Sequence, residues 1–179
     1  MPDETYPKFS LRAFLRLTRF WNLFIIGIAQ YFAALFLIDS QLLFDWKLMV
    51  LAFSTAIIAG AGYIINDYYD IKIDLINKPD RVVIGKEIGR RYALLFHSVL
   101  SFSGVGLGFL LGWRLGLIHI FSSFILWWYS NNLKRQPFVG NFMVALLTGL
   151  SILLVNLLYN MDNSFIIIYS LFAFFITLV

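Results

Sequence analysis

The 179-residue chain contains no cysteine, only four prolines and few charged residues. Without cysteine it can form neither a disulfide framework nor a thiolate metal site. Charged residues make up 13% of the sequence and hydrophobic residues 60%, which lies outside the usual range of soluble domains. The sequence also lacks a short repeat and a low-complexity or proline-rich linker. We therefore expect a single membrane-embedded domain over residues 1–179.

The segments without charged residues are long apolar runs. A helix that crosses a bilayer needs roughly 20 mainly apolar residues, and runs of about that length recur along the chain. The sequence predicts an all-α, polytopic bundle of six spans, at Phe20–Ile38, Trp46–Ile65, Tyr92–Leu111, Leu115–Tyr129, Phe138–Tyr159 and Ser164 to the end.

The first and the last apolar run each indicate something about how the chain is processed or how far it extends. The first run follows a basic segment and has no small-residue cleavage site, which indicates a retained span and not a cleaved signal peptide. The last ten residues, SLFAFFITLV, stop inside an apolar run without the polar residues that normally follow a span. The sequence therefore indicates an incomplete bundle, and it leaves open whether the natural protein continues past residue 179.

Basic residues alternate between the connections. Four precede the first span, six lie between the second and third spans, and two lie between the fourth and fifth, whereas Lys47 and Arg114 fall elsewhere. Positively charged loops stay on the cytoplasmic side during insertion. This pattern predicts a cytoplasmic amino terminus and an inner or plasma membrane. It also explains the net charge of +4 without a nucleic-acid partner, and we expect none.

Residues 1–19 form a basic segment ahead of the first span. Within residues 8–19, KFSLRAFLRLTR, apolar Phe9, Phe14, Leu15 and Leu17 are interspersed with basic residues. The pattern fits a helix that lies along the membrane surface. It fits equally well a topology signal with no further role.

Acidic residues cluster directly after the second span, in NDYYDIKIDLINKPDR. If the helix continues at 100° per residue, Asn66, Asp67, Asp70 and Asp74 fall within an arc of about 100°. Magnesium is commonly held by one or two carboxylates together with substrate phosphates. This face therefore suits a metal-bound diphosphate, although a solvated helix surface can also carry several acids.

Cationic residues lie in the connections on the same side. Lys78, Arg81 and Lys86 occupy a loop broken by Pro79 and Gly85, where they could bind phosphate oxygens. The alternative is that they only hold this loop on the cytoplasmic side.

A second such connection is YSNNLKR, residues 129–135, in which Lys134 and Arg135 could complete a basic rim around the acidic face. Arg19 and Asn22 stand at the cytoplasmic end of the first span, where Arg19 could instead act as a topology anchor.

Polar residues inside the spans carry less information. Asn141 and Asn156 could line a polar cavity or bond neighbouring helices. His97 and His119 lack ligand spacing to each other or to acids, so we assign the histidines no role.

These motifs together resemble the UbiA family of membrane prenyltransferases. The family's first aspartate-rich motif, NDxxDxxxD, is matched by Asn66, Asp67, Asp70 and Asp74. Agreement continues through INKPDR, GKEIGRRYAL, YSNNLKR and GNFMVALLTG, in the family's order. The NKPDR segment is most similar to the branch that includes geranylgeranylglycerol-phosphate geranylgeranyltransferases and chlorophyll synthases.

The resemblance implies a fold of nine spans with two aspartate-rich motifs that hold Mg²⁺ and diphosphate. Only the first motif is present here, and no acidic residue follows Asp162. Where some members place the tyrosine and lysine of the YSNNLKR connection four residues apart, Tyr129 and Lys134 are five apart.

The expected site residues follow from the resemblance and the charge pattern. Asn66, Asp70 and Asp74 are expected to bind the metal, and Asp70, Asp74 and Lys134 to act in catalysis. The expected substrate-binding residues are Asn66, Asp67, Arg81, Lys78, Arg19, Asn22 and Tyr129.

The predicted function is transfer of an isoprenoid chain from a prenyl diphosphate to a lipid or aromatic acceptor, for instance geranylgeranylglycerol phosphate, through Mg²⁺-assisted ionisation. The alternative is a non-catalytic or truncated relative that binds prenyl diphosphate or partners without turnover. A small transporter is a third hypothesis, against which the acids gather at one membrane face and no inverted repeat is evident. The sequence leaves the oligomeric state open.

Overall fold

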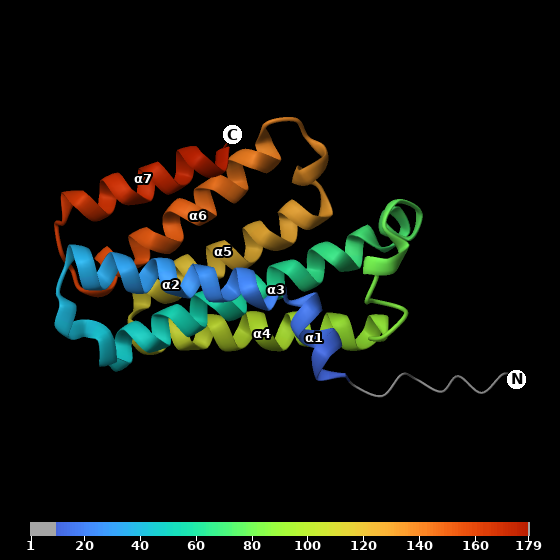
Figure 1. Cartoon of the computed structure of the whole chain (residues 1–179), viewed down its shortest axis with the longest axis horizontal. Helices are drawn as coiled ribbons and strands as arrows, with labels where there is room; N and C mark the ends of the chain where they lie inside the picture. Colours follow the sequence, from blue (N-terminus) through green and yellow to red (C-terminus); the bar gives the residue numbers. More distant parts are fainter. Residues whose placement is uncertain (1–9, 179) are drawn as a thin grey trace, which may run out of the picture.

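The computed structural model describes residues 10–178, which form seven α-helices (Figure 1). Three short 3₁₀ helices, at Ser40–Phe44, Pro79–Arg81 and Leu133–Arg135, lie in the connections. The α-helices are α1 (Leu11–Leu17), α2 (Phe20–Leu37), α3 (Trp46–Asn77), α4 (Arg90–Leu111), α5 (Trp113–Asn131), α6 (Val139–Leu158) and α7 (Ser164–Leu178).

Helices α2 to α7 correspond one to one with the six predicted spans, which confirms the all-α fold. By length and hydropathy, α2, α3, α4 and α6 are each able to cross a bilayer. Helix α7 is apolar but has 15 residues, and α5 falls outside the same criterion, although both pack within the bundle. That α5 and α7 also cross the membrane stays a prediction.

Helix α3 is the centre of the bundle and contacts α2, α4, α5 and α6. It has 32 residues, so it is about 48 Å long and exceeds the roughly 30 Å hydrocarbon layer by several turns. The predicted span ended at Ile65, but the helix continues to Asn77 because Ile71 packs into a buried cluster beyond the span. Pro79 ends it, since proline disfavours the helical conformation of the preceding residue.

The connections alternate between the two ends of the bundle. Figure 1 shows α1, the α3–α4 connection and the α5–α6 connection at one end, with the α2–α3, α4–α5 and α6–α7 connections at the other. The end that holds α1 carries most of the basic residues, whereas Lys47 and Arg114 lie at the opposite end. The antiparallel course of the helices thus separates charge in the way the sequence predicts.

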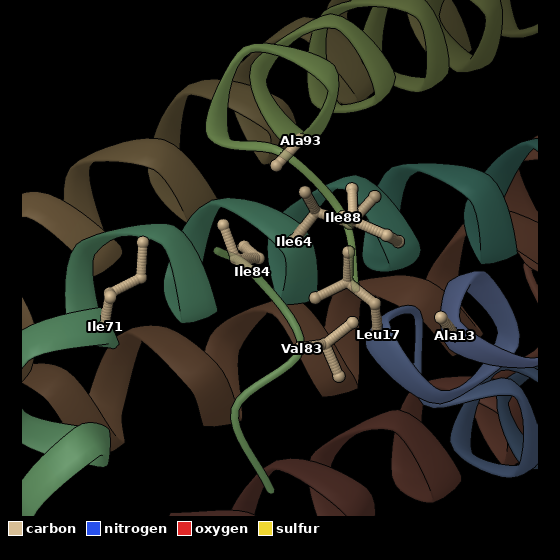
Figure 2. Packing of buried hydrophobic residues seen from close by; sticks show 8 residues of the cluster. All are labelled: Ala13, Leu17, Ile64, Ile71, Val83, Ile84, Ile88 and Ala93. Carbon is tan, nitrogen blue, oxygen red and sulfur yellow. The ribbon is translucent and has the colours of Figure 1, made fainter. Parts of the chain in front are cut away.

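A small hydrophobic cluster, which we call the cap, lies at the basic end. Ala13 and Leu17 of α1 pack against Ile64 of α3 and against residues of the α3–α4 connection (Figure 2). Gly85, at φ +90, turns this connection back on itself so that its backbone N–H donates to Ile88. Glycine suits that turn because other residues are strained at such φ values. The cap consists of Ala13, Leu17, Ile64, Ile71, Val83, Ile84, Ile88 and Ala93.

Helix α1 occupies part of the basic amino-terminal segment. It begins after Ser10, whose hydroxyl accepts a hydrogen bond from the Ala13 N–H, and it buries one face in the cap while Leu11 stays exposed. Arg16 of α1 forms an ion pair with Glu87. Lys8 and Phe9, which belong to the predicted surface helix, lie outside the described residues.

The outer surface of the bundle is unusually apolar. Large side chains such as Phe36, Ile76 and Phe102 are each more than three quarters exposed. Soluble proteins rarely expose contiguous apolar surface on this scale, whereas lipid-facing helices must. The surface therefore supports an integral membrane protein.

Candidate active site

The acidic face predicted from the sequence lies on the part of α3 that extends past the span. Asn66, Asp67, Asp70 and Asp74 follow one another along this continuous helix, and all four are partly buried. The helix thus presents an amide oxygen and three carboxylates at the basic end of the bundle.

Lys134 reaches this face from the 3₁₀ helix that follows α5. Its ammonium nitrogen lies 2.5 Å from Asp70 Oδ1 and 3.4 Å from Asn66 Oδ1. The lysine side chain is 13% exposed and that of Asp70 21%, so the ion pair is partly shielded from water. A shielded charge pair of this kind interacts more strongly than a surface pair.

Gly140 at the start of α6 allows Lys134 to lie where it does. A Cβ atom at this position would be 3.2 Å from both the Leu133 carbonyl oxygen and Lys134 Cα, and 3.4 Å from the Tyr129 ring. Only a residue without a side chain leaves room for the connection to lie so closely against α6. The glycine therefore helps to position the lysine.

Arg19 reaches the acidic face from the junction of α1 and α2. It joins α1 to α2 in a left-handed conformation, at φ 53 and ψ 54. Its guanidinium lies 3.0 Å from Asp67 Oδ1 and 4.7 Å from the centre of the Tyr63 ring. Left-handed backbone is costly for residues with a Cβ, and such strain often occurs at functional sites.

A cavity of about 300 Å³ opens beside these residues. Arg19, Tyr63, Asn66 and Tyr129 surround its mouth, and the walls below are mainly apolar residues of α3, α5 and α6. Asn22 borders the same region, since its amide lies 3.5 Å from the Tyr63 hydroxyl. The cavity combines a charged rim with an apolar interior, which matches a ligand that has a polar head and an apolar tail.

The structure brings some predicted residues together and leaves others apart. Arg19, Asn66 and Tyr129 line the cavity. Asp67 forms an ion pair with Arg19, whereas Lys134 pairs with Asp70 and donates a hydrogen bond to Asn66. Asp74 lies one turn beyond Asp70 on the same helix.

The remaining predicted cations lie elsewhere at the basic end. Lys78 and Arg81 are exposed at the end of α3 and in the turn that follows it, and neither has an ion-pair partner among the described residues. Lys86 donates to the Pro79 carbonyl oxygen, and Arg135 points to the exterior as an exposed residue.

Sequence reasoning did not single out Tyr63, although it lies three residues before Asn66 on α3. This spacing places the two residues on the same side of a helix and could have suggested the position.

His119 also lines the cavity, where its Nε2 lies 2.9 Å from Ser54 Oγ. His97 Nδ1 is 3.0 Å from the Ala61 carbonyl oxygen. Both histidines therefore link neighbouring helices.

The two asparagines of α6 do not line the cavity. Asn156 is buried and its side-chain oxygen accepts from the Asn163 backbone, whereas Asn141 is exposed. Asn163 in turn donates to the Leu37 carbonyl oxygen, so this network ties α6 and α7 to α2.

The donor set fits a hard cation that shares its coordination with a ligand. No group of three or more histidine, aspartate or glutamate side chains in residues 10–178 is close enough to form a metal site by itself. One helix face nevertheless offers the Asn66 amide oxygen and the Asp70 and Asp74 carboxylates. Mg²⁺ commonly takes only one or two carboxylates and completes its shell with phosphate oxygens and water.

Comparisons with known proteins show the family of this chain. Residues 23–179 match the model of the UbiA prenyltransferase family. The digeranylgeranylglyceryl phosphate synthase of Saccharolobus solfataricus is 36% identical over 95% of this chain and 61% of that protein. The synthase of the same name from Methanococcoides burtonii is 36% identical over 76% of this chain and 46% of that protein.

A solved structure has a similar fold. It comes from work on the biosynthesis of digeranylgeranylglyceryl phosphate synthase in membranes, and it has a TM-score of 0.74 and 27% sequence identity to this chain. The match covers 94% of this chain and 58% of that one. This chain thus spans less than two thirds of the length of these relatives.

Proposed function

Because the chain belongs to the UbiA prenyltransferase family, we propose that it transfers an isoprenoid chain from a prenyl diphosphate to a lipid acceptor within the membrane. The observation that carries the proposal is the pairing of Lys134 with Asp70 and Asn66 at the mouth of a mainly apolar cavity. A prenyl diphosphate has the complementary form, with a charged head and a hydrocarbon tail.

The acceptor we propose is a glyceryl phosphate that already carries one geranylgeranyl chain. Support comes from the relatives, which are named digeranylgeranylglyceryl phosphate synthases. Such an acceptor attacks through a hydroxyl and gives an ether lipid. An aromatic acceptor, which would usually attack through a ring carbon, is the competing hypothesis.

The donor's diphosphate is proposed to lie between α3 and the two cationic side chains. Lys134 approaches from the α5–α6 connection and Arg19 from the α1–α2 junction, so two separate parts of the chain can each supply a cation to the phosphate oxygens. Charge-assisted hydrogen bonds of this type are stronger than neutral ones. Lys78 and Arg81, at the exposed end of α3, are proposed to extend this cationic surface toward the incoming diphosphate.

Asn66, Asp70 and Asp74 are proposed to hold Mg²⁺ together with the diphosphate. When bound, such a cation would neutralise charge on the departing diphosphate. The residues of the chain then orient the head group, with Asp67 fixing Arg19 through their ion pair.

The reaction breaks the bond between the first prenyl carbon and the diphosphate oxygen, which leaves with the bonding electrons. Lys134 and Arg19 stabilise the charge that develops on this leaving group. The acceptor hydroxyl oxygen forms the new bond to the same carbon, and its proton passes to the diphosphate or to water at the mouth. The apolar walls below keep water from the allylic cation.

We also propose that the basic end of the bundle faces the cytoplasm. The positive-inside rule supports this orientation, since α1 and the α3–α4 and α5–α6 connections carry the basic residues. The diphosphate would then be taken from the cytoplasmic leaflet.

A direct test is product formation by the purified chain in lipid nanodiscs. Labelled geranylgeranyl diphosphate is supplied with Mg²⁺ and either geranylgeranylglycerol phosphate or an aromatic acceptor. EDTA and Asp70→Ala should each abolish product. Asp162→Ala serves as the matched control, because Asp162 is an exposed carboxylate at the other end of the bundle.

The outcomes separate the hypotheses. An ether lipid that requires Mg²⁺ and Asp70 would support the proposal and identify the acceptor class. Donor binding without product from either acceptor would support a chain that binds prenyl diphosphate without turnover. A folded chain that neither binds the donor nor forms product would contradict the proposal.

A further inference from the structure

Two residues of the acidic face turn their oxygen atoms toward the same cationic side chain. Asn66 and Asp70 are four residues apart on α3, so their side chains are neighbours on one side of the helix. The Lys134 ammonium nitrogen lies 3.4 Å from Asn66 Oδ1 and 2.5 Å from Asp70 Oδ1. Lys134 therefore contacts two of the three residues that are proposed to hold Mg²⁺.

The ion pairs leave little uncompensated negative charge for a metal ion. Asp67 is paired with Arg19, and Asp70 is paired with Lys134. Of the three carboxylates on the acidic face, only Asp74 has no ion-pair partner in the described part of the chain. A divalent cation that arrives alone must therefore share Asp70 with an ammonium group, which carries charge of the same sign.

The repulsion between two such cations is large. Cations that contact one carboxylate are about 4–5 Å apart, and a unit charge and a divalent charge at that distance repel each other even with the screening of bulk water. This repulsion corresponds to about a tenfold loss of affinity for the metal. The Lys134 side chain is only 13% exposed, so water screens it less than it screens a surface charge.

Lys134 is anchored at its backbone, whereas its side chain can move. The preceding residue, Leu133, is buried, and Gly140 allows the Lys134 backbone to lie close against α6. The four-carbon stem of a lysine is flexible, so the ammonium group can change its position while the backbone stays in place. Because Asn66 also lines the cavity, a short movement takes the ammonium group from the acidic face to a phosphate at the mouth.

We propose that Lys134 keeps a free divalent cation off the acidic face and releases Asp70 only to a cation that arrives with the donor's diphosphate. This inference rests on the proposed function for the identity of the donor. A diphosphate has anionic oxygens that complete the coordination shell of Mg²⁺ and also attract the ammonium group. Lys134 then moves from Asp70 to the diphosphate, and the Asp70 carboxylate becomes available to the metal.

Removing the lysine charge should therefore act in opposite directions on the two ligands. The acidic face should bind a free divalent cation more tightly, because Asp70 is no longer shared with an ammonium group. The donor and its cation should bind more weakly together, because the diphosphate loses a charge-assisted contact. A variant that is merely damaged would instead lose affinity for both ligands.

The test measures the binding of Mn²⁺ in place of Mg²⁺, through the electron paramagnetic resonance signal of the unbound ion. The chain is placed in nanodiscs of zwitterionic lipid, and empty nanodiscs serve as the blank. In Lys134→Met we expect the Kd of Mn²⁺ alone to fall about tenfold relative to the wild type. The Kd of labelled geranylgeranyl diphosphate, measured with Mn²⁺ and without an acceptor, should rise in the same variant.

Three further variants assign the effect to this ion pair. Lys134→Gln is a second neutral replacement, which keeps a hydrogen-bond donor for Asp70, and it should show the same gain in Mn²⁺ affinity. Lys72→Met removes an exposed positive charge from α3 and should change the Mn²⁺ affinity far less. Lys134→Met combined with Asp70→Asn should lose the gain, because the released carboxylate is then absent. Thermal melting establishes that each variant is folded before its binding is compared.

The outcomes separate this inference from the proposed function. If the folded neutral variants bind Mn²⁺ alone no more tightly than the wild type, the competition for Asp70 is overturned, whether or not the donor binds. If the gain appears while donor binding is unchanged, the movement of Lys134 to the diphosphate is overturned. If the gain appears but neither the wild type nor any variant binds geranylgeranyl diphosphate, the competition stands and the proposed function is overturned.

Discussion

Lys134 and Asp70 are 64 residues apart in the sequence, yet the ammonium nitrogen lies 2.5 Å from the carboxylate oxygen. The pair joins the acidic face of α3 to the connection between α5 and α6. Because both side chains are largely shielded, each charge depends on the other for much of its stabilisation. The same two charges are proposed to meet the donor's diphosphate and its metal, so this pair is the first target for mutation.

Replacing Lys134 with methionine should weaken donor binding about tenfold or more, since it removes a charge-assisted contact to phosphate. The free energy of unfolding should also fall by about 1–3 kcal/mol, because Asp70 loses its partner. Competition binding and thermal melting measure the two effects. Lys72→Met is the matched control. Lys72 is exposed on α3, the helix that carries Asp70, and it has no ion-pair partner in the described structure. Equal losses in both variants would contradict a specific role for Lys134.

Arg19 allows backbone strain to be separated from side-chain chemistry. Both Arg19→Gly and Arg19→Ala remove the contacts with Asp67 and Tyr63, so both should weaken donor binding to a similar degree. Their stabilities should differ, because glycine adopts the left-handed conformation at φ 53 without strain. We expect the glycine variant to be more stable by about 1 kcal/mol. An alanine variant as stable as the glycine variant would refute the presence of strain.

Gly140 should be intolerant of a methyl group. In Gly140→Ala the new Cβ would lie 3.2 Å from the Leu133 oxygen and from Lys134 Cα, so the connection that carries the lysine must move. We expect a loss of about 1–3 kcal/mol in stability together with weaker donor binding. Gly106→Ala on α4 is the control, since a Cβ there meets nothing within 4 Å. Chemical denaturation and competition binding would reveal the difference, and a harmless Gly140→Ala would count against the close approach.

The opposite end of the bundle offers a pH test. Burial, and then the hydrogen bond to Asp45, raise the pKa of Tyr159 above the usual value of 10.0. The Tyr159 hydroxyl donates to Asp45 Oδ2 at 2.7 Å, while Asp45 Oδ1 caps the first turn of α3. Above about pH 10 the unfolded chain releases this proton and the folded chain keeps it, so stability should decline as pH rises.

Tyr159→Phe provides the comparison for that decline. The variant should be about 1 kcal/mol less stable at neutral pH because it lacks the hydrogen bond. It should also lose less stability than the wild type between pH 9 and pH 11, as followed by thermal melting. Parallel curves for the two proteins would show that Tyr159 does not control the alkaline transition.

Much of the fold could be predicted because membrane insertion depends on local properties. Each apolar run from Phe20 onward became a helix, since a bilayer leaves backbone groups few other ways to bond. The acidic face was also predictable, because Asn66 and Asp70 are one helical turn apart. The extent of α3 was not, since it depends on the packing of Ile71 with residues from a distant loop.

The partners of the acidic residues could be suggested but not assigned from the sequence. Lys134, Lys78 and Arg81 are all cations in connections on the same side, yet only Lys134 reaches Asp70. Its position depends on the close approach at Gly140, which no local pattern reveals. His119 was assigned no role because it lacks nearby ligands in the sequence, and its place in the cavity follows from the packing of α5 against α3.

The unbroken course of α3 from Trp46 to Asn77 also couples the two ends of the molecule through helical phase. An extra residue inserted near Ile57 would rotate everything beyond it by about 100°, and Asp70 would face away from Lys134 although no side chain had been lost. Seven inserted residues would restore the phase to within about 20° but would displace the carboxylates by roughly 10 Å along the axis. Insertions and deletions in this helix should therefore be far less tolerated than substitutions, because the helix sets both the direction and the depth of the acidic face.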